Sequence, residues 1–222
     1  MTDKAKIKEI FTSIQGEGPF IGYKQVFIRF CGCNLNCSYC DTAFDDNECK
    51  TYTSDELIDY IKNHLDCHSV SLTGGEPLLH AGFLKEFIPQ CPLPIYLETN
   101  GTLSGELGEV IDYIDYVAAD IKLPSATGGI GYWSDHAHFF ETAEHKLLFA
   151  KIVFDDKIND DEITQCCKLG ANFNVELILQ PKMNPNNEMV NTDFIQNTLD
   201  KFLEKYKKVR IIPQVHKFLN VR

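Results

Sequence analysis

Short apolar segments alternate with amphipathic segments along most of the chain, and this alternation limits the possible folds more than any other feature. The predicted strands are Val26–Phe30, Ser69–Leu72, Ile95–Leu97, Tyr116–Ala119, Leu147–Phe154, Val175–Leu179 and Val209–Ile212. The predicted helices are Ser54–Leu65, Phe83–Ile88, Leu107–Ile114, Ala137–Glu144, Asp161–Leu169 and Asp193–Tyr206. Strands that alternate with helices predict an α/β fold with a mainly parallel sheet covered by helices.

The chain length limits how that sheet closes. We count about six βα units in 222 residues, whereas a complete eight-unit barrel typically takes ~250 residues. An open, partial barrel or a doubly wound sheet therefore fits better. In both folds the loops at the carboxyl ends of the strands hold the functional site.

Composition excludes several classes of function. Lys and Arg number 21 against 32 Asp and Glu, a formal charge of −11, so we expect no binding to nucleic acid and none to an anionic membrane surface. No apolar run approaches the ~20 residues that span a bilayer, and the amino terminus lacks the apolar stretch of a signal peptide. We therefore expect a cytoplasmic protein. Its nine cysteines are then expected to be reduced, or to bind metal or do redox chemistry.

The strongest local signal is a C-x3-C-x2-C spacing formed by Cys33, Cys37 and Cys40, directly after the first predicted strand. Three thiolates on one short loop can surround a soft metal centre. A structural zinc site would need a fourth ligand, for which Cys31 or Cys49 is available. An iron–sulfur cluster held by three cysteines would instead leave one iron open to a small ligand.

Together with Thr73-Gly74-Gly75-Glu76-Pro77 after the second predicted strand, this loop resembles the radical S-adenosylmethionine (SAM) superfamily. The resemblance implies a [4Fe–4S] cluster on Cys33, Cys37 and Cys40, with SAM on the open iron. It places the SAM contacts at polar strand ends, although each could equally be a helix cap or turn. The implied SAM-binding residues are Tyr39, Cys40, Asp41, Gly75, Glu76, Glu98, Asn100, Asp120, Ile121, Lys122 and Gln180.

A more specific resemblance rests on Ser13–Pro19, Phe27–Phe30, Cys40-Asp41-Thr42 and Pro213–His216. These segments are similar to the 7-carboxy-7-deazaguanine synthase family of the queuosine pathway. The resemblance implies an open (βα)6-type radical SAM barrel, with residues 1–222 as one domain and a hairpin or turn at about residues 7–24 beside the substrate. The implied substrate-binding residues are Ile14, Gln15, Gly16, Glu17, Arg29, Thr73 and His216. Arg29 could pair with a substrate carboxylate or with a structural one.

The resemblance also implies a reaction. Members of the family convert 6-carboxy-5,6,7,8-tetrahydropterin to 7-carboxy-7-deazaguanine by a radical ring contraction that releases ammonia, forming a precursor for tRNA modification. They use the cluster, SAM and Mg²⁺, and Thr42 corresponds to the residue whose hydroxyl binds Mg²⁺. The expected partners are a flavodoxin or ferredoxin as reductant and a second copy of the chain in a homodimer. No residue is assigned as a general acid or base.

Two rival interpretations follow from the same residues. Another small radical SAM enzyme, such as a glycyl-radical activase, would share the cysteine spacing and the Gly-Gly-Glu-Pro motif. A zinc-stabilised binding protein would use the same three cysteines and a fourth. In the favoured interpretation the six other cysteines, among them Cys49 and the Cys166-Cys167 pair, are ordinary reduced thiols.

Overall fold

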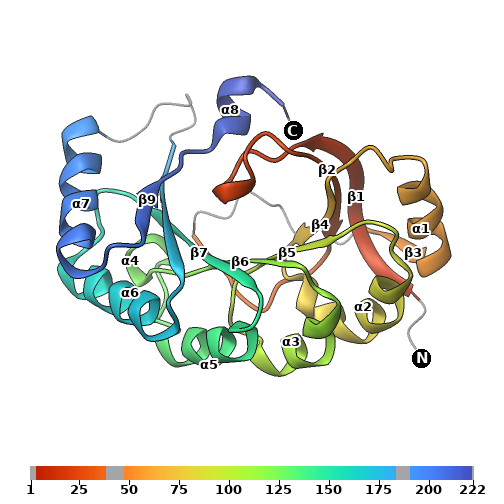
Figure 1. Ribbon diagram of the computed structural model, residues 1–222, viewed down its shortest axis with the longest axis horizontal. Helices are drawn as coiled ribbons and strands as arrows, with labels where there is room; N and C mark the ends of the chain where they lie inside the picture. Colours follow the sequence, from red (N-terminus) through yellow and green to blue (C-terminus); the bar gives the residue numbers. More distant parts are fainter. Residues whose placement is uncertain (1–3, 39–47, 184–190, 222) are drawn as a thin grey trace.

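A computed structural model of the chain describes residues 4–38, 48–183 and 191–221. Nine strands form one sheet in the order β3-β1-β2-β4-β5-β6-β7-β8-β9. The strands are β1 (Lys4–Ile14), β2 (Lys24–Phe30), β3 (Lys50–Thr53), β4 (Ser69–Gly74), β5 (Ile95–Thr99), β6 (Tyr116–Asp120), β7 (Leu147–Phe154), β8 (Glu176–Pro181) and β9 (Val209–Ile211). The sheet curves around a central space but does not close (Figure 1).

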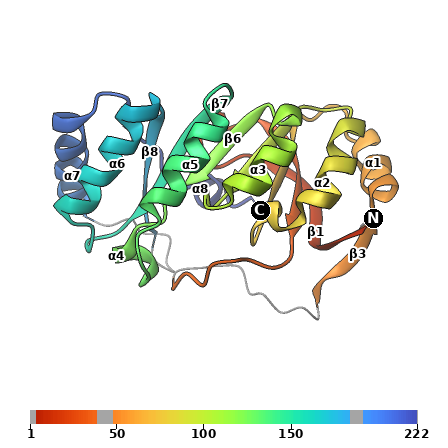
Figure 2. The same ribbon diagram turned by 90° about the horizontal axis from the view of Figure 1, so that it is seen from below.

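The helices lie mostly along the outer, convex side of this sheet, but the last of them lies apart, next to the turn before β2 (Figures 1 and 2). They are α1 (Ser54–Lys62), α2 (Ala81–Phe87), α3 (Ser104–Val110), α4 (Pro124–Thr127), α5 (Trp133–Ala143), α6 (Asp160–Phe173), α7 (Thr192–Lys205) and α8 (Val215–Leu219). Thr53 and Glu56 form a capping box at the start of α1, and Asn159 and Glu162 form another at the start of α6. The described residues include no helix that is long and apolar enough to cross a membrane.

From β2 to β9 all neighbouring strands are parallel, whereas β1 runs antiparallel to β2 and β3 antiparallel to β1. The predicted α/β fold, an open and mainly parallel barrel, is therefore confirmed. Each of the seven predicted strands and six predicted helices has a counterpart, with ends that differ by a few residues.

Alternation along the strands separates two layers of side chains. One set, such as Ile28, Leu72 and Leu97, joins the main core beneath the helices. The other set points into the barrel, where Tyr96, Ala118, Phe149 and Ile178 form a separate apolar cluster. The ring of Phe20 lies 5.3 Å from that of Tyr96 and closes this apolar floor. The functional residues described below lie above it, toward the carboxyl ends of the strands.

Four elements have no counterpart among the predicted strands and helices, although β1 overlaps the hairpin or turn expected at about residues 7–24. β1 precedes the strand that the sequence indicates as the first, and its register with β2 shifts between Ile7 and Glu9. This irregularity breaks the two-residue alternation that identifies a strand. The short elements β3, α4 and α8 span at most five residues each, which is too few to show a periodicity.

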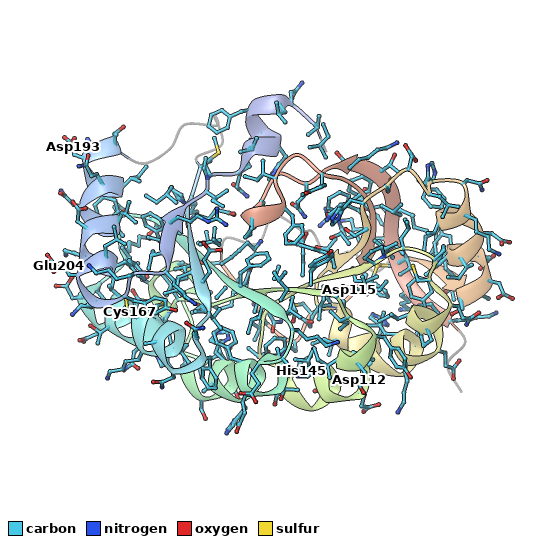
Figure 3. All side chains as sticks on the ribbon, in the orientation of Figure 1. Asp112, Asp115, His145, Cys167, Asp193 and Glu204 are labelled. Atoms are coloured by element: carbon cyan, nitrogen blue, oxygen red, sulfur yellow. A yellow bond between two sulfur atoms is a disulfide. The ribbon has the colours of Figure 1, made fainter. Side chains whose placement is uncertain are left out.

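The prediction that all cysteines outside the cluster motif are reduced is wrong for one pair. Cys31 follows β2, Cys49 precedes β3, and the structure joins them in a disulfide. Both strands pair with β1, and this brings the two cysteines together although they are 18 residues apart. Neither is then free to act as the fourth ligand of a zinc site. Cys166 and Cys167 are buried on α6 as predicted, and Cys167 lies in the outer helical layer (Figure 3).

Candidate active site

The turn that joins β1 to β2 extends over the inner face of the barrel beside α8 (Figure 1). Gln15, at the start of this turn, is buried, and its amide nitrogen donates to Gln25 at 3.0 Å and to Glu98 at 2.9 Å. The same Glu98 carboxylate accepts from Ser71 at 3.0 Å and from Thr73 at 3.2 Å. Glu98 therefore ties the turn to the inner faces of β4 and β5.

Glu17, in the same turn, is a second buried anchor. Its Oε1 accepts from the side-chain amides of Gln180 at 3.2 Å and Gln214 at 2.9 Å, and its Oε2 pairs with Lys151. Burial opposes ionisation, but the charge of Lys151 and the hydrogen bonds from Gln214 and Lys151 lower the pKa of Glu17 to about 2. Glu17 is thus a carboxylate at neutral pH, fixed by β7, β8 and the carboxy-terminal segment.

The ion pairs continue across the strand ends. Lys151 lies 3.2 Å from Asp120, which in turn lies 2.9 Å from Lys122. Burial raises the pKa of Asp120, but the charges of Lys122 and Lys151 outweigh burial and lower it below its ordinary value. Two acidic and two basic side chains therefore alternate along this row, and their formal charges cancel.

The backbone after β4 approaches its neighbour so closely that a glycine is required. Gly74 has φ of +127°, and a Cβ there would lie 2.5 Å from the backbone nitrogen of Phe30. The next glycine, Gly75, donates its N–H to Phe30 at 3.1 Å, and Glu76 donates its N–H to Gly32 at 2.8 Å. The Gly-Gly-Glu-Pro segment therefore supports the beginning of the cysteine loop.

The carboxylate of Glu76 is fully buried and faces protein donors. It accepts from the backbone nitrogens of Leu78 at 3.1 Å and Asn100 at 2.7 Å, and from the hydroxyl of Thr99 at 2.8 Å. Burial raises the pKa of Glu76 to about 7. In this arrangement Glu76 joins the loops after β4 and β5, and the part-exposed Gly75 is the more open of the two predicted SAM contacts.

The described part of the cysteine loop lies against the loops after β5 and β6. The side chains of Cys33 and Cys37 are part-exposed. The Sγ of Cys33 accepts from the N–H of Leu35 at 3.4 Å and faces the side-chain amide of Asn100 at 3.9 Å. Ser38 donates its N–H and its hydroxyl to the carbonyls of Thr127 and Ala126 in α4, at 3.1 and 2.9 Å.

These contacts fit a sulfur-ligated cluster. Burial and the Glu76 charge raise the pKa of the Cys33 thiol, and the Leu35 N–H, the Asn100 amide and the Lys122 charge offset this only in part. Donors of this kind to a ligand sulfur are a usual means of tuning an iron–sulfur cluster. Cys40, the third predicted ligand, lies outside the described residues, and within the part that is described no three His, Cys, Asp or Glu gather as a metal site.

Three further predicted site residues have distinct surroundings. Arg29 donates from Nε to Glu9 at 2.8 Å, so one side of its guanidinium already has a protein partner. The Ile121 side chain is buried in the main core, which leaves only its backbone for a ligand. His216 lies on α8 directly against Gly16, where a Cβ would collide with it. Tyr39, Cys40, Asp41 and Thr42 lie outside the described residues.

Two residues of this region were not predicted from the sequence. Lys151 links Glu17 to Asp120. It is the single charged residue in the apolar strand Leu147–Phe154, and this is the sequence feature that could have drawn attention to it. His136 is fully buried, with Nδ1 3.0 Å from the Gly101 carbonyl and Nε2 accepting from the Lys122 N–H at 3.2 Å. It thereby connects the loops after β5 and β6. No sequence pattern distinguished it from the six other histidines.

Comparisons with known proteins agree with this geometry. Residues 27–127 match the model of the radical SAM superfamily. The chain is 37% identical to the 7-carboxy-7-deazaguanine synthase of Geobacter sulfurreducens, over 97% of each chain. It is 35% identical to that of Archaeoglobus fulgidus, over 99% of this chain and 100% of the relative. The crystal structure of QueE from Escherichia coli has the same fold, with a TM-score of 0.66 at 21% identity, covering 96% of this chain and 95% of that one.

Proposed function

The chain belongs to the 7-carboxy-7-deazaguanine synthase family of radical SAM enzymes, and we propose that it binds its substrate between the turn at Gln15–Glu17 and the cysteine loop. The protein is a radical SAM enzyme that converts 6-carboxy-5,6,7,8-tetrahydropterin to 7-carboxy-7-deazaguanine with loss of ammonia. Our proposal concerns which residues perform this reaction.

One observation supports this placement above the others. Gln15 of the turn bonds to Glu98, while the amide of Asn100, two residues further along the chain, faces Cys33. In an extended strand, residues two apart lie on the same face with Cα atoms ~7 Å apart. The end of β5 therefore connects the turn to the cysteine loop over about the length of a bicyclic heterocycle.

The side chains suit a flat heterocycle rich in hydrogen-bond donors and acceptors. We propose that Ile14, Gln15, Gly16 and Glu17 meet the nitrogen-rich edge through backbone and carboxylate groups. Arg29 then pairs with the substrate carboxylate, with Thr73 and His216 at its sides. Among the described residues, the buried Oε1 of Gln180 has no hydrogen-bond partner, and it is free to accept from a ligand donor.

A [4Fe–4S] cluster with SAM supplies the radical chemistry of this superfamily when it is bound. We propose Cys33, Cys37 and Cys40 as its ligands. The other proposed SAM contacts are Tyr39 and Asp41 of the cysteine loop and residues at or just after the carboxyl ends of β4, β5, β6 and β8. The protein orients the bound molecules and excludes water, and the apolar floor formed by Tyr96 and Phe149 closes the barrel below them.

The decisive experiment is anaerobic turnover. Reconstituted enzyme is incubated with 6-carboxy-5,6,7,8-tetrahydropterin, SAM, a reductant and Mg²⁺, and products are separated by liquid chromatography and mass spectrometry. We expect 7-carboxy-7-deazaguanine and ammonia, and no deazaguanine from a Cys33→Ala variant. SAM cleavage without deazaguanine would reject the assigned reaction, and it would favour another radical SAM enzyme such as a glycyl-radical activase.

Metal content separates the enzyme from a zinc-stabilised binding protein. Anaerobically purified protein should be brown, with about four irons per chain. Colourless protein with stoichiometric zinc would contradict the cluster assignment.

Several finer features also belong to this proposal. We propose that Thr42 contributes a hydroxyl to Mg²⁺, and a Thr42→Ala variant that keeps the full Mg²⁺ dependence would refute this role.

A flavodoxin or ferredoxin is the proposed reductant, and reconstitution of activity with each purified donor tests this. Residues 1–222 are proposed to act as one domain within a homodimer in the cytoplasm, and light scattering of the purified enzyme tests the dimer.

A further inference from the structure

Lys151 is a buried charge in the middle of the apolar strand β7. Its side chain is 7% exposed, and its neighbours Ala150 and Ile152 lie in the main core. It points into the barrel, as does Phe149 of the apolar floor two residues earlier. A lysine is rarely buried to this extent without acidic partners, so its partners indicate what it does.

Those partners come from two different parts of the site. Glu17 belongs to the turn over the barrel, and Asp120 ends β6 beside the predicted SAM contact Lys122. Although burial lowers the pKa of Lys151, the charges of Asp120, Glu17 and Glu98 raise it well above its ordinary value. Lys151 is therefore a permanent cation between two carboxylates.

The contacts of Glu17 leave room for a ligand. A carboxylate offers about four acceptor positions, of which Gln180, Gln214 and Lys151 occupy three. The Glu17 side chain is 18% exposed, against 7% for Lys151. Glu17 is thus the more accessible member of the pair to a molecule entering the barrel, and it has one acceptor position left.

We propose that Lys151 is a positioning residue that holds Glu17 as an oriented carboxylate for the N–H groups at the amino-pyrimidine edge of the substrate. The inference rests on the proposed substrate-binding role of Glu17. Without Lys151, Glu17 and Asp120 would be two buried carboxylates without their shared cation, and Glu17 would turn away or take up a proton. Either change removes the acceptor that the substrate needs.

Steady-state kinetics of four reconstituted enzymes test this proposal. They are the wild type, Lys151→Met, Glu17→Gln and the double variant, assayed anaerobically with varied pterin at saturating SAM. We expect each single substitution to raise KM for the pterin at least tenfold, with kcat changed less than threefold. The double variant should match Glu17→Gln, because Lys151 acts through Glu17. Lys201→Met, which breaks an exposed pair with Asp160 on α6, should keep the wild-type KM.

Two outcomes would overturn the inference. One is a wild-type KM in Lys151→Met, and the other is a double variant whose KM rises a further tenfold above that of Glu17→Gln. If Lys151→Met does not fold, the comparison of Glu17→Gln with the double variant still tests the proposal. Neither of these two variants buries a Glu17 carboxylate without its Lys151 partner. Failure of the proposed function looks different, because the wild-type enzyme itself would then not convert the pterin.

Discussion

The two loops on either side of β2 are fixed in different ways. The turn before β2 is held by buried charge, since Glu17 pairs with Lys151 and Gln15 bonds to Glu98. The described part of the cysteine loop after β2 has the Cys31–Cys49 disulfide across its ends, and between them it is held by neutral hydrogen bonds. Asn34 bonds to the side chains of Asn100 at 2.7 Å and Thr102 at 2.9 Å, and Ser38 bonds to the carbonyls of α4.

This difference predicts that the turn and the cysteine loop depend to different degrees on a bound cluster. Breaking a buried ion pair costs about 3–5 kcal/mol because the remaining charge has no partner. A neutral hydrogen bond contributes about 1 kcal/mol. The turn should therefore keep its geometry whether or not the cluster is present, and cluster binding should stabilise the contacts of Cys33 and Ser38 more than those of the turn.

Loss of a cluster ligand is the largest predicted effect. In Cys33→Ala we expect iron to fall from about four per chain to background, with complete loss of turnover. Pterin binding to the same variant, measured by calorimetry, should stay within about threefold of the metal-free wild type, since the turn does not depend on the metal. Cys91→Ala removes another free, part-exposed thiol and should keep its iron. Full iron in Cys33→Ala would contradict the ligand assignment.

Mild acid should break the link made by His136 before it affects the turn, although protonation of Glu76, whose pKa burial raises to about 7, favours the folded state over the same pH range. Burial lowers the pKa of His136 to about 4 from an ordinary value of 6.5, so its contribution to stability is complete above pH 6.5 and is lost as the pH falls toward 4. The loss amounts to at most about 3 kcal/mol. Glu17, with a pKa of about 2 against an ordinary 4.5, loses its contribution only as the pH falls below 4.5.

Urea unfolding of metal-free protein at several pH values measures this difference. The free energy of unfolding of His136→Gln should fall less between pH 6.5 and 4 than that of the wild type. His138→Gln, an exposed position on the same helix, should follow the wild type. Identical slopes for the wild type and His136→Gln would show that His136 does not act as a neutral link between the two loops.

Adding a side-chain methyl group at Gly16 tests how closely the turn packs against α8. A Cβ on Gly16 would lie 2.5 Å from the backbone nitrogen of His216, and the backbone of Gly16 also accepts from Val215 at 2.8 Å. Gly16→Ala should push α8 away, at a cost of about 2 kcal/mol in unfolding free energy, and raise KM for the pterin. Gly108→Ala on α3, where a Cβ has open space, should leave both quantities close to wild type or slightly raise stability.

The same two loops show what could be read from the sequence. The cysteine spacing and the Gly-Gly-Glu-Pro segment are local patterns, and the sequence predicted both the order of the βα units and the two loops that meet at the barrel mouth. The anchors of the turn are not local. Glu17 and Lys151 are 134 residues apart, and nothing in the sequence indicates that they pair.

The disulfide and helix α8 could not be predicted for a related reason. Cys31 and Cys49 meet because β2 and β3 both pair with β1, and β1 itself was hidden by an irregular register. Helix α8 has only five residues and depends on Gly16 for its place. In each case a contact between distant segments, and not a pattern within one segment, determines the structure.

Loss of the contact between the cysteine loop and α4 has the smallest effect that we predict. Ser38 lies between the ligands Cys37 and Cys40, and its hydroxyl donates to the Ala126 carbonyl at 2.9 Å. α4 is in turn attached to α6, because the Ser125 N–H donates to Glu162 at 2.7 Å. Through these two hydrogen bonds, α6 and α4 together hold Ser38 in place within the cysteine motif.

Ser38→Ala removes one neutral hydrogen bond at an exposed position, so the loss in stability should not exceed about 1 kcal/mol. Because the bond adjoins two cluster ligands, we expect its loss to appear as a several-fold faster release of iron to a chelator under anaerobic conditions. Ser54→Ala is the matched control, since its buried hydroxyl has no hydrogen-bond partner among the described residues. An unchanged rate of iron release in Ser38→Ala would mean that the cluster, and not α4, fixes this part of the loop, which would make the contrast with the turn sharper still.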